Sequence, residues 1–422
     1  MKISVLSLGC KVSQYEGGAI KEELLKMGYD ATTDFVLADY YILNTCAVTN
    51  EAEHKSRSYL TKILNKNENA KIFVCGCASE HSLEQFLKNP AVIYASGNAK
   101  KNNIPLVLDN YIKLNQLECN QYKKLNLEYN NFKCYTLSRT RAYLKIQDGC
   151  NNFCSYCLIP FVRGRSRSRE LSDIVKEATY LSKFNKEIVL TGINMSDYRI
   201  NGELALDKVM LALSNLDCRI RISSLEVNII TEDLLKVLKS MPNFCPQFHL
   251  SMQSGCTRIL NLMNRHYTAQ EYIDKVNLIR KYFDNVTITT DVIVGFPTET
   301  EQDFLQTIDT IKKAKFFKMH IFPYSLRAGT KASRMPQING LIKKQRVKEL
   351  EKLDNILHTE YLYSVKDKIQ TALIEAENED YAYGYTETYV KVYVDKSVKK
   401  GELIKVKLSK IYKDGMLAEI LS

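Results

Sequence analysis

The chain has 422 residues, 45% of them hydrophobic, and carries a formal net charge of +11. Its length allows about two to four domains of roughly 100 to 200 residues each, and the positive charge favours a polyanionic partner, because Lys and Arg release counterions when they neutralise phosphates. No apolar run approaches the roughly 18 to 20 residues of a membrane helix, and the N-terminal apolar run is too short for a signal peptide, so we expect a cytoplasmic protein without a membrane partner.

The first predicted domain, residues 1–135, alternates short apolar strands with amphipathic helices, which is typical of an open parallel α/β sheet. Residues 111–138 are polar and Asn-rich, and they predict a linker with one strand at most. The expected strands span 2–9, 40–45 and 71–76, and the expected helices lie near 19–28 and 54–66.

Cys10, Cys46 and Cys77 each lie just past the end of one of these strands. Because the carboxyl ends of neighbouring parallel strands share one edge of an open sheet, cysteines far apart in the sequence can converge there. Three ordinary buried cysteines are the alternative, since free cysteine is common in cores. Cys75 lies two residues before Cys77 on the same strand, and we interpret it as a core residue.

Three more cysteines fall in one short stretch, Cys150, Cys154 and Cys157. Three thiolates on a four-iron cluster leave one iron open, and that iron can chelate the amino and carboxylate groups of S-adenosylmethionine (SAM) and deliver the electron that cleaves it to a radical. A zinc site is the alternative, but zinc usually takes four ligands and no fourth Cys or His stands nearby in the sequence. The total of 12 cysteines in a chain expected in the cytosol also favours metal or redox chemistry over disulfides.

Arginines flank this stretch on both sides. We interpret them as a basic rim at the mouth of a radical site, where a large anionic substrate docks, with a solvated basic run as the alternative. The arginines after the stretch are Arg163, Arg165, Arg167 and Arg169, and those before it are Arg139 and Arg141.

The second predicted domain, residues 136–365, continues the alternation of strands with longer helices and predicts a partial (β/α)6 TIM-like barrel, whose site gathers at the carboxyl ends of the strands. Thr298 and Glu301 predict a capping box that opens one helix. The expected strands are 142–148, 187–192, 219–224, 247–253, 286–295 and 319–325.

A charged amphipathic helix is expected at 341–365. Residues 366–422 then alternate short β-like runs with turns, which predicts a small antiparallel β-barrel. Five tyrosines of this barrel could stack on unpaired bases, although half of an alternating run usually faces the core. The segment has ten Lys and no Arg against ten Asp and Glu, so any RNA binding there must come from a local face.

Several short motifs, in this order and spacing, resemble those of the radical-SAM methylthiotransferases over nearly the whole chain. The stretch 146–169, with NNFCSYC, and the Lys after LGC look most like the branch that modifies threonylcarbamoyladenosine in transfer RNA. The other motifs are LGCKVSQYE at 8–16, LNTCAVT at 43–49, VCGCA at 74–78, LTGIN at 190–194, RISSLE at 221–226, HLSMQSG at 249–255, DVIVGFPTET at 291–300 and FPYSLRAGT at 322–330.

The resemblance implies two 4Fe–4S clusters, one on Cys150, Cys154 and Cys157 and a second on the three N-terminal cysteines. It also implies that the enzyme consumes two SAM molecules, one as methyl donor to a sulfur on the second cluster and one as radical source, to place a methylthio group on carbon 2 of an adenosine beside the tRNA anticodon. A C-terminal TRAM domain, an OB-like RNA-binding barrel, is common in this family. Ser13 stands where the family has Asn.

Other predicted roles combine chemistry with this resemblance. Glu226 is the expected partner of a ribose hydroxyl or of the methionine amine of SAM, because a carboxylate accepts from both. Neutral hydrogen bonds to SAM are expected from Ser223, Ser224, Gln253 and Ser254. The candidates for contacts with substrate or RNA are Tyr324 and Arg327, together with Arg163, Arg165 and Arg167.

The expected partners are the tRNA anticodon stem-loop, an electron donor such as flavodoxin or ferredoxin, and a sulfur donor, and a monomer is the expected state. Within the family, isopentenyladenosine in tRNA or an aspartate of a ribosomal protein are alternative substrates. From a different class, the chain could be a noncatalytic iron–sulfur protein that binds RNA. A sensor of that kind needs no open iron, whereas both sites offer only three matched cysteines.

Overall fold

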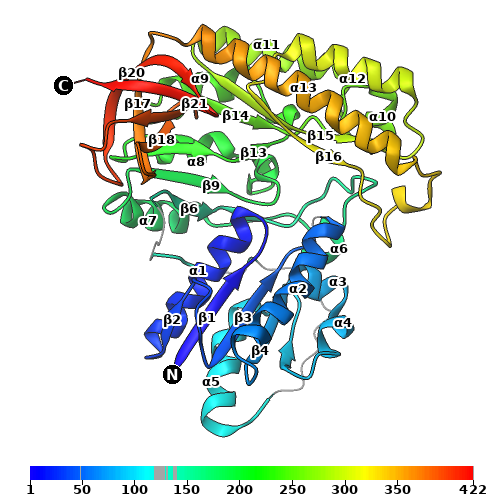
Figure 1. The fold of residues 1–422 in the computed structure, drawn as a ribbon, viewed down its shortest axis with the longest axis vertical. Helices are drawn as coiled ribbons and strands as arrows, with labels where there is room; N and C mark the ends of the chain where they lie inside the picture. The colour runs from blue at the N-terminus through cyan, green and yellow to red at the C-terminus, as the bar shows by residue number, and fades with distance from the viewer. Residues whose placement is uncertain (48, 118–128, 130–131, 136–139, 422) are drawn as a thin grey trace.

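The computed structural model describes residues 1–47, 49–117, 129, 132–135 and 140–421. Within these ranges the chain forms an N-terminal parallel sheet, an arc of parallel strands covered by helices, and a closed C-terminal barrel (Figure 1). This mixed α/β architecture confirms the predicted fold class. No helix among the described residues is long and apolar enough to cross a membrane.

The N-terminal sheet has the strand order β2-β1-β3-β4-β5, and every pair in it is parallel. Its strands are β1 (Lys2–Ser7), β2 (Asp30–Thr32), β3 (Tyr40–Thr45), β4 (Lys71–Gly76) and β5 (Val92–Ala95), and its helices are α1 (Lys11–Lys26), α2 (Asn50–Lys66), α3 (Cys77–His81), α4 (Leu83–Leu87) and α5 (Ile104–Leu114).

Helix α1 begins well before the expected 19–28, although Gly17 and Gly18 lower helix propensity. A Cβ added at Gly17 would lie 1.9 Å from the Ser7 side-chain oxygen, so close packing on the sheet requires glycine there. Helix α5 extends to Leu114, so the start of the expected linker 111–138 is helical. Most of the remaining linker lies outside the described residues.

The central strands form two parallel sheets, in the orders β12-β9-β6 and β13-β14-β15-β16. They are continuous as an arc, because the segment 219–225 pairs first with β9 and then with β14. We call this set the strand arc. Its members are β6 (Ala142–Lys145), β9 (Glu187–Thr191), β12 (Arg219–Ile222), β13 (Ser224–Leu225), β14 (Gln247–Leu250), β15 (Thr287–Val294) and β16 (Lys318–Pro323).

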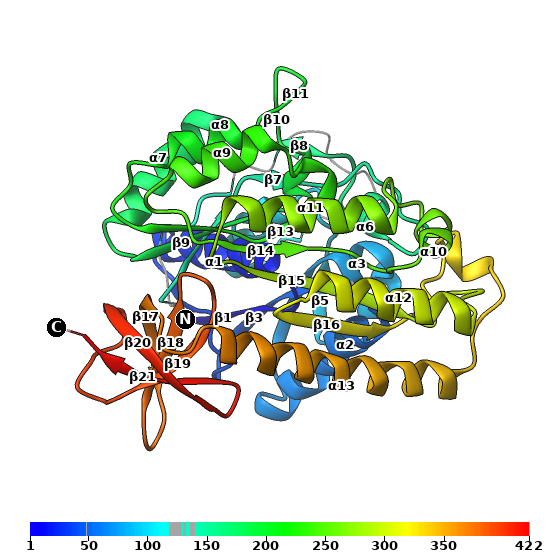
Figure 2. The same cartoon turned by 90° about the horizontal axis from the view of Figure 1, so that it is seen from above.

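Helices cover the outer side of the strand arc (Figure 2). They are α7 (Leu171–Ser182), α8 (Leu206–Ala212), α9 (Glu232–Ser240), α10 (Thr257–Leu262), α11 (Ala269–Tyr282), α12 (Glu301–Ala314) and α13 (Gly340–Ser364). The short elements around the arc are α6 (Ile159–Val162), β7 (Gln147–Asp148), β8 (Arg167–Ser168), β10 (Arg199–Ile200) and β11 (Glu203–Leu204).

The capping box of α12 differs from the prediction. Thr300 is the N-cap, and its side chain accepts a hydrogen bond from the Asp303 backbone while Asp303 reaches back to the N-cap. The predicted box of Thr298 with Glu301 is wrong, because Thr298 lies in the left-handed region at φ +67° and Glu301 is already the first helical residue. The sequence offers acceptable box residues in two registers, and the preceding turn selects one.

The C-terminal barrel closes in the order β17-β18-β19-β21-β20. Its pairs are antiparallel, as expected, except that β19 and β21 run parallel. The strands are β17 (Ile369–Glu377), β18 (Ala382–Thr386), β19 (Lys391–Val394), β20 (Leu403–Tyr412) and β21 (Gly415–Ile420).

Buried arginines attach the C-terminal barrel to the amino ends of the arc strands. Arg219 donates to the Thr371 carbonyl at 2.8 Å, and Arg221 donates to the Glu387 carbonyl at 3.0 Å. Glu187, fully buried at the start of β9, pairs with both guanidinium groups. Burial alone would raise the pKa of Glu187, but the charges of Arg221 and Arg219 lower it to about 2. The carboxylate is therefore ionised at neutral pH, and the barrel is fixed by ion pairs and backbone hydrogen bonds.

The cap assignment yields a stability prediction. Thr300→Ala should lower the free energy of unfolding by about 1 kcal/mol, because it leaves a backbone N–H of the first turn without its acceptor. Thr298→Ala is the matched control and should change stability by less than half of that, since its hydroxyl caps nothing. Urea denaturation followed by circular dichroism measures both, and an equal loss in the two variants would contradict the assignment.

Candidate functional site

Cys150, Cys154 and Cys157 lie in the loop between β7 and α6, and each sulfur has an N–H group nearby. The backbone N–H of Asn152 lies 3.5 Å from the Cys150 sulfur, and that of Ile159 lies 3.4 Å from the Cys157 sulfur. Arg265 Nη1 lies 3.5 Å from the Cys154 sulfur. Such N–H donors stabilise the thiolates that ligate iron–sulfur clusters, so the donor set fits a cluster with three protein ligands.

The pKa of the Cys150 thiol is raised to about 11 and that of the Cys157 thiol to about 12, mainly by burial and partly by the neighbouring Cys154 thiol. Without a cation these sulfurs would therefore keep their protons at neutral pH. A metal cluster that displaces the protons removes this cost, since thiolates are the form that binds metal.

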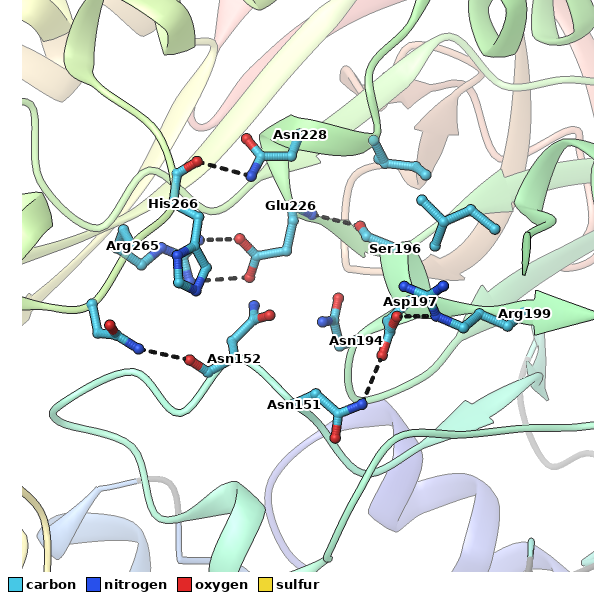
Figure 3. Close-up of a pocket in the computed structure, with 13 residues that line it drawn as sticks. Asn151, Asn152, Asn194, Ser196, Asp197, Arg199, Glu226, Asn228, Arg265 and His266 are labelled. Atoms are coloured by element: carbon cyan, nitrogen blue, oxygen red, sulfur yellow. Dashed lines mark hydrogen bonds and ion pairs between the residues drawn. The ribbon is translucent and has the colours of Figure 1, made fainter. Parts of the chain in front are cut away.

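A cavity of about 290 Å³ opens beside this loop (Figure 3). Its central feature is the ion pair of Glu226 with Arg265, in which Arg265 Nη1 donates to Glu226 Oε1 at 3.0 Å and Nη2 contacts the second oxygen. Asn194 lines the same cavity, and its side-chain nitrogen lies 3.7 Å from the Cys150 sulfur. A carboxylate that accepts hydrogen bonds and a guanidinium and an amide that donate them therefore lie beside the cysteine loop.

The structure separates the residues predicted to contact SAM. Glu226 lines the cavity beside the cysteine loop, whereas Ser223 and Ser224 line a different and larger cavity. Ser254 is fully buried beside Thr307, which is incompatible with a direct contact in this conformation, and Gln253 lines neither cavity.

Arg265 and Asn194 were not predicted from the sequence. Asn194 ends the motif LTGIN, at the carboxyl end of β9, which is a signal that could have found it. Arg265 follows α10 in a segment without any motif, and only folding brings it to the cysteine loop.

Cys10, Cys46 and Cys77 follow the adjacent strands β1, β3 and β4, so all three lie at one sheet edge. Two glycines show how closely these loops pack. A Cβ added at Gly9 would lie 2.4 Å from the Cys46 sulfur, and a Cβ added at Gly76 would lie 2.5 Å from the Thr45 carbonyl oxygen. The loops meet through glycine contacts, as a site built from three distant cysteines requires.

Ser13 and Cys75 lie near this edge of the sheet. Cys10 Sγ lies 3.8 Å from the Ser13 hydroxyl, so a polar contact to this cysteine is present although the family has Asn there. Cys75 is fully buried on β4, packed in the apolar core on the helix α1 side of the sheet.

Arg163 joins the two cysteine sites through a set of buried charges that we call the charge cluster: Glu16, Lys101, Lys145, Asp148 and Arg163. Arg163 Nη1 lies 2.9 Å from Glu16 and 3.0 Å from Asp148. Lys145 lies 2.9 Å from Glu16 and 2.7 Å from Asp148, and Lys101 lies 2.6 Å from Glu16. Burial alone would raise the pKa of Glu16, but the charges of Arg163, Lys101 and Lys145 hold it well below its usual value.

The charge cluster contains three cations and two carboxylates, so it has one excess positive charge. The sulfur of Cys77 lies next to Arg163 of this cluster. Arg163 Nε donates to the Cys77 sulfur at 3.2 Å, and the Asn98 side-chain amide lies 3.5 Å from the same sulfur. A thiolate at Cys77 would neutralise the excess positive charge. The Cys77 sulfur therefore has two hydrogen-bond donors beside it, as the sulfur of a metal ligand would require.

The predicted basic rim needs correction. Arg163 is 2% exposed and Arg327 is 3% exposed, so neither can reach RNA from this conformation. Arg327 instead binds Glu53 of α2 at 2.7 Å and thereby ties the strand arc to the N-terminal sheet. Tyr324 is also buried, 5% exposed, against Phe296. The sequence could not show this, because the carboxylate partners are far away along the chain.

The remaining arginines differ in exposure. Arg165 is exposed, and its guanidinium lies over the Phe153 ring at 4.3 Å. Arg167 is partly buried and donates to the carbonyl oxygens of Arg163 and Arg165. Arg139 lies outside the described residues. Within the described part of the chain, Arg165 is therefore the exposed member of the predicted rim.

A second cavity, of about 800 Å³, lies at the inner face of the strand arc and reaches the C-terminal barrel. His249, Asp291 and His320 project from consecutive strands into it, with one ligand atom of each within 4.8 Å of the others. Burial raises the pKa of Asp291, but the hydrogen bond with His249 at 3.2 Å and the two histidine charges outweigh this and lower it. Burial lowers the pKa of His320.

Residues 144–311 match the family model described as the radical SAM superfamily, and residues 2–96 match the model described as uncharacterized protein family UPF0004. The chain is 36% identical to the threonylcarbamoyladenosine tRNA methylthiotransferase MtaB of Bacillus subtilis (strain 168), over 98% of this chain and 96% of the relative. It is 35% identical to the MtaB of Aquifex aeolicus (strain VF5), over 96% and 100%. It is also 32% identical to the tRNA-2-methylthio-N(6)-dimethylallyladenosine synthase of Thermodesulfovibrio yellowstonii, over 100% and 99%.

Solved structures agree with the fold. The radical SAM methyltransferase TsrM of Kitasatospora setae superposes with a TM-score of 0.55 at 12% identity, covering 79% of this chain and 76% of TsrM. The cobalamin-dependent SAM radical enzyme OxsB superposes with a TM-score of 0.53 at 12% identity, covering 84% of this chain and 56% of OxsB. At these identities the likeness concerns the arrangement of elements and nothing finer.

The charge cluster yields a stability prediction. Arg163→Gln should lower the free energy of unfolding by about 3 to 5 kcal/mol, because Glu16 and Asp148 stay buried after losing one of the two cations that they share. Arg165→Gln, an equivalent change at an exposed arginine, should leave stability nearly unchanged. Chemical denaturation of the two variants measures this, and a small effect at Arg163 would show that the charge cluster does not support the fold.

Proposed function

This chain belongs to the tRNA methylthiotransferases of the radical SAM superfamily, and from that membership we propose that it places a methylthio group on carbon 2 of N6-threonylcarbamoyladenosine beside the tRNA anticodon. The observation that carries this proposal is the near full-length similarity to relatives named for that reaction. The three-cysteine loop beside the pair Glu226 and Arg265 supplies matching chemistry.

Two sets of cysteines would hold two 4Fe–4S clusters: Cys150, Cys154 and Cys157 in the strand arc, and Cys10, Cys46 and Cys77 at the edge of the N-terminal sheet. When bound, the first cluster supplies the electron that converts SAM to a 5′-deoxyadenosyl radical, and the second presents a sulfur at its open iron. The number of clusters rests on the convergence of the three N-terminal loops and on the polar groups around the Cys77 sulfur.

The cavity beside the cysteine loop is the proposed SAM site. Arg265 would bind the methionine carboxylate, because a guanidinium matches a carboxylate in shape and charge. Glu226 would accept hydrogen bonds from the methionine amine or from a ribose hydroxyl. Arg265 and Glu226 pair with each other, so SAM would replace one charged contact with another inside a partly buried site.

The anionic partner of the basic surface would be the tRNA anticodon stem-loop, with the C-terminal barrel in the role of a TRAM-like RNA-binding module. Arg165 is exposed next to the cysteine loop, and it is the arginine of the predicted rim that we expect to contact the RNA. The electron donor would be a small redox protein such as flavodoxin or ferredoxin, the sulfur would come from a separate donor, and the enzyme would act as a cytoplasmic monomer.

Cysteine variants test the division between the two sites. Cys154→Ala should abolish SAM cleavage, because the radical site then lacks a ligand. Cys46→Ala should retain some abortive SAM cleavage but produce no methylthiolated product. The control is Cys75→Ala, which removes a buried thiol of the same sheet and should keep both activities. Anaerobic assays of 5′-deoxyadenosine and of product separate these cases, and equal loss of cleavage in the two ligand variants would contradict the division.

The substrate is tested by mass spectrometry of nucleosides from tRNA of cells with and without the gene. Loss of the methylthiolated threonylcarbamoyl species, with accumulation of its unthiolated precursor, is the expected result. Loss of the methylthiolated isopentenyl species instead would assign the chain to the other group of relatives. If neither species changed, the tRNA assignment would be overturned.

A further inference from the structure

The larger cavity, of about 800 Å³, is a junction of all three parts of the chain. Lys11 lines it from α1 of the N-terminal sheet, Asp291 and His320 line it from the strand arc, and Tyr385 and Tyr389 line it from the C-terminal barrel. Its volume lies in the range of about 300 to 1,000 Å³ that binds an organic ligand. It is therefore large enough for a nucleoside, and it is distinct from the smaller cavity beside the cysteine loop.

Most charged side chains in this cavity already have partners. Arg141 lies 2.5 Å from Glu375, and Lys391 lies 2.9 Å from Asp414. The other paired cations of the cavity are Arg221, held by Glu187, and Lys318, held by Asp354. These four cations are therefore largely neutralised by carboxylates of the chain itself.

Lys11 differs from these cations. Across the ranges that the structure describes, no carboxylate lies within ion-pair distance of its ammonium group, and the side chain is exposed to the cavity. Lys413 shares this property, but it lies over the Tyr412 ring at 5.0 Å. Lys11 lines the same cavity as His320, whose pKa is lowered first by burial and further by the positive charge of Lys11. An anion that enters the cavity would find an unneutralised positive charge there.

The position of Lys11 in the chain adds a second constraint. It directly follows Cys10, one of the three cysteines at the sheet edge. In adenine, carbon 2 and the carbon that bears N6 flank the same ring nitrogen. A base whose carbon 2 approaches the Cys10 edge therefore holds its N6 substituent within reach of a long side chain in the same loop.

We propose that Lys11 binds the carboxylate of the threonylcarbamoyl group and so determines which modified adenosine the enzyme accepts. This inference rests on the proposed function, because it takes the modified base as the ligand of the larger cavity. The ammonium group attracts an anionic N6 substituent. It also disfavours an apolar prenyl group, which would desolvate the charge without pairing it. His320 and Asp291, linked through His249, form the polar wall opposite the same substituent.

A divalent cation is an alternative ligand for this part of the cavity, because His249, Asp291 and His320 offer three ligand atoms close together. The neighbouring charge of Lys11 opposes it, and the hydrogen bond of His249 with Asp291 already occupies one candidate ligand on each residue. The charge of this part of the cavity favours an anion.

The test measures the affinity of reconstituted protein for anticodon stem-loop RNAs that carry threonylcarbamoyladenosine, its carboxyl methyl ester, or isopentenyladenosine. Wild type should bind the acid more tightly than the ester by about tenfold to a hundredfold, the range for one hydrogen bond to a charged group. Lys11→Gln should remove this difference, whereas Lys11→Arg should keep it. Lys21→Gln, the same change on the same helix but outside the cavity, is the matched control and should behave as wild type.

The outcomes separate the inference from the proposed function. If wild type prefers the acid and Lys11→Gln preserves that preference with full iron content, the inference is overturned and the proposed function stands. If wild type does not prefer the acid over the isopentenyl RNA, both are overturned. Iron content and circular dichroism of each variant establish that a change next to Cys10 has not altered the fold or the metal site.

Discussion

The charge cluster is the interaction on which the rest of the structure depends. Glu16 comes from α1 and Lys101 from the end of the N-terminal region, whereas Lys145 comes from β6 of the strand arc and Asp148 and Arg163 come from the segment that carries the cysteine loop, β7 to α6. Removing these charges from water is expensive, and only their mutual pairing offsets the desolvation. Because the partners belong to different parts of the chain, the pairing fixes the N-terminal sheet against the strand arc, and with it the position of one cysteine site relative to the other.

Buried ion pairs also fix the C-terminal barrel to the strand arc. Glu187 holds Arg219 and Arg221, and these arginines donate to carbonyl oxygens of the C-terminal barrel. The stacked rings of Tyr385 and Tyr389 lie beside Arg141, at centroid distances of 5.2 and 5.1 Å. These tyrosines were candidates for base stacking, but their position against Arg141 makes them part of the interface and of the larger cavity. The C-terminal barrel thus forms one wall of the larger cavity as well as an outer surface.

The sequence predicted the features that depend on local pattern. Strand and helix periodicity gave the parallel sheet, the strand arc and the C-terminal barrel, and the rule that strand ends share an edge placed Cys10, Cys46 and Cys77 together. It did not predict the role of Arg163, because a run of arginines after a loop looks the same whether the carboxylates that bury one of them lie nearby or, like Glu16, on a distant helix. Arg265 was missed for the same reason, and the cap was predicted at Thr298 and not at Thr300 because the backbone of the preceding turn is not visible in the pattern.

One short segment of the strand arc lines both the smaller cavity beside the cysteine loop and the larger cavity at the inner face of the arc. Residues 219–226 pair first with β9 and then with β14, so the segment bends across the arc between them. Ser223 and Ser224 face the larger cavity, whereas Glu226 faces the smaller cavity beside the cysteine loop. The segment therefore separates two different environments. It presents hydroxyl groups to the larger cavity, and it presents a carboxylate paired with Arg265 to the cavity beside the cysteine loop. The bend therefore gives each cavity its own lining without interrupting the hydrogen-bonded arc.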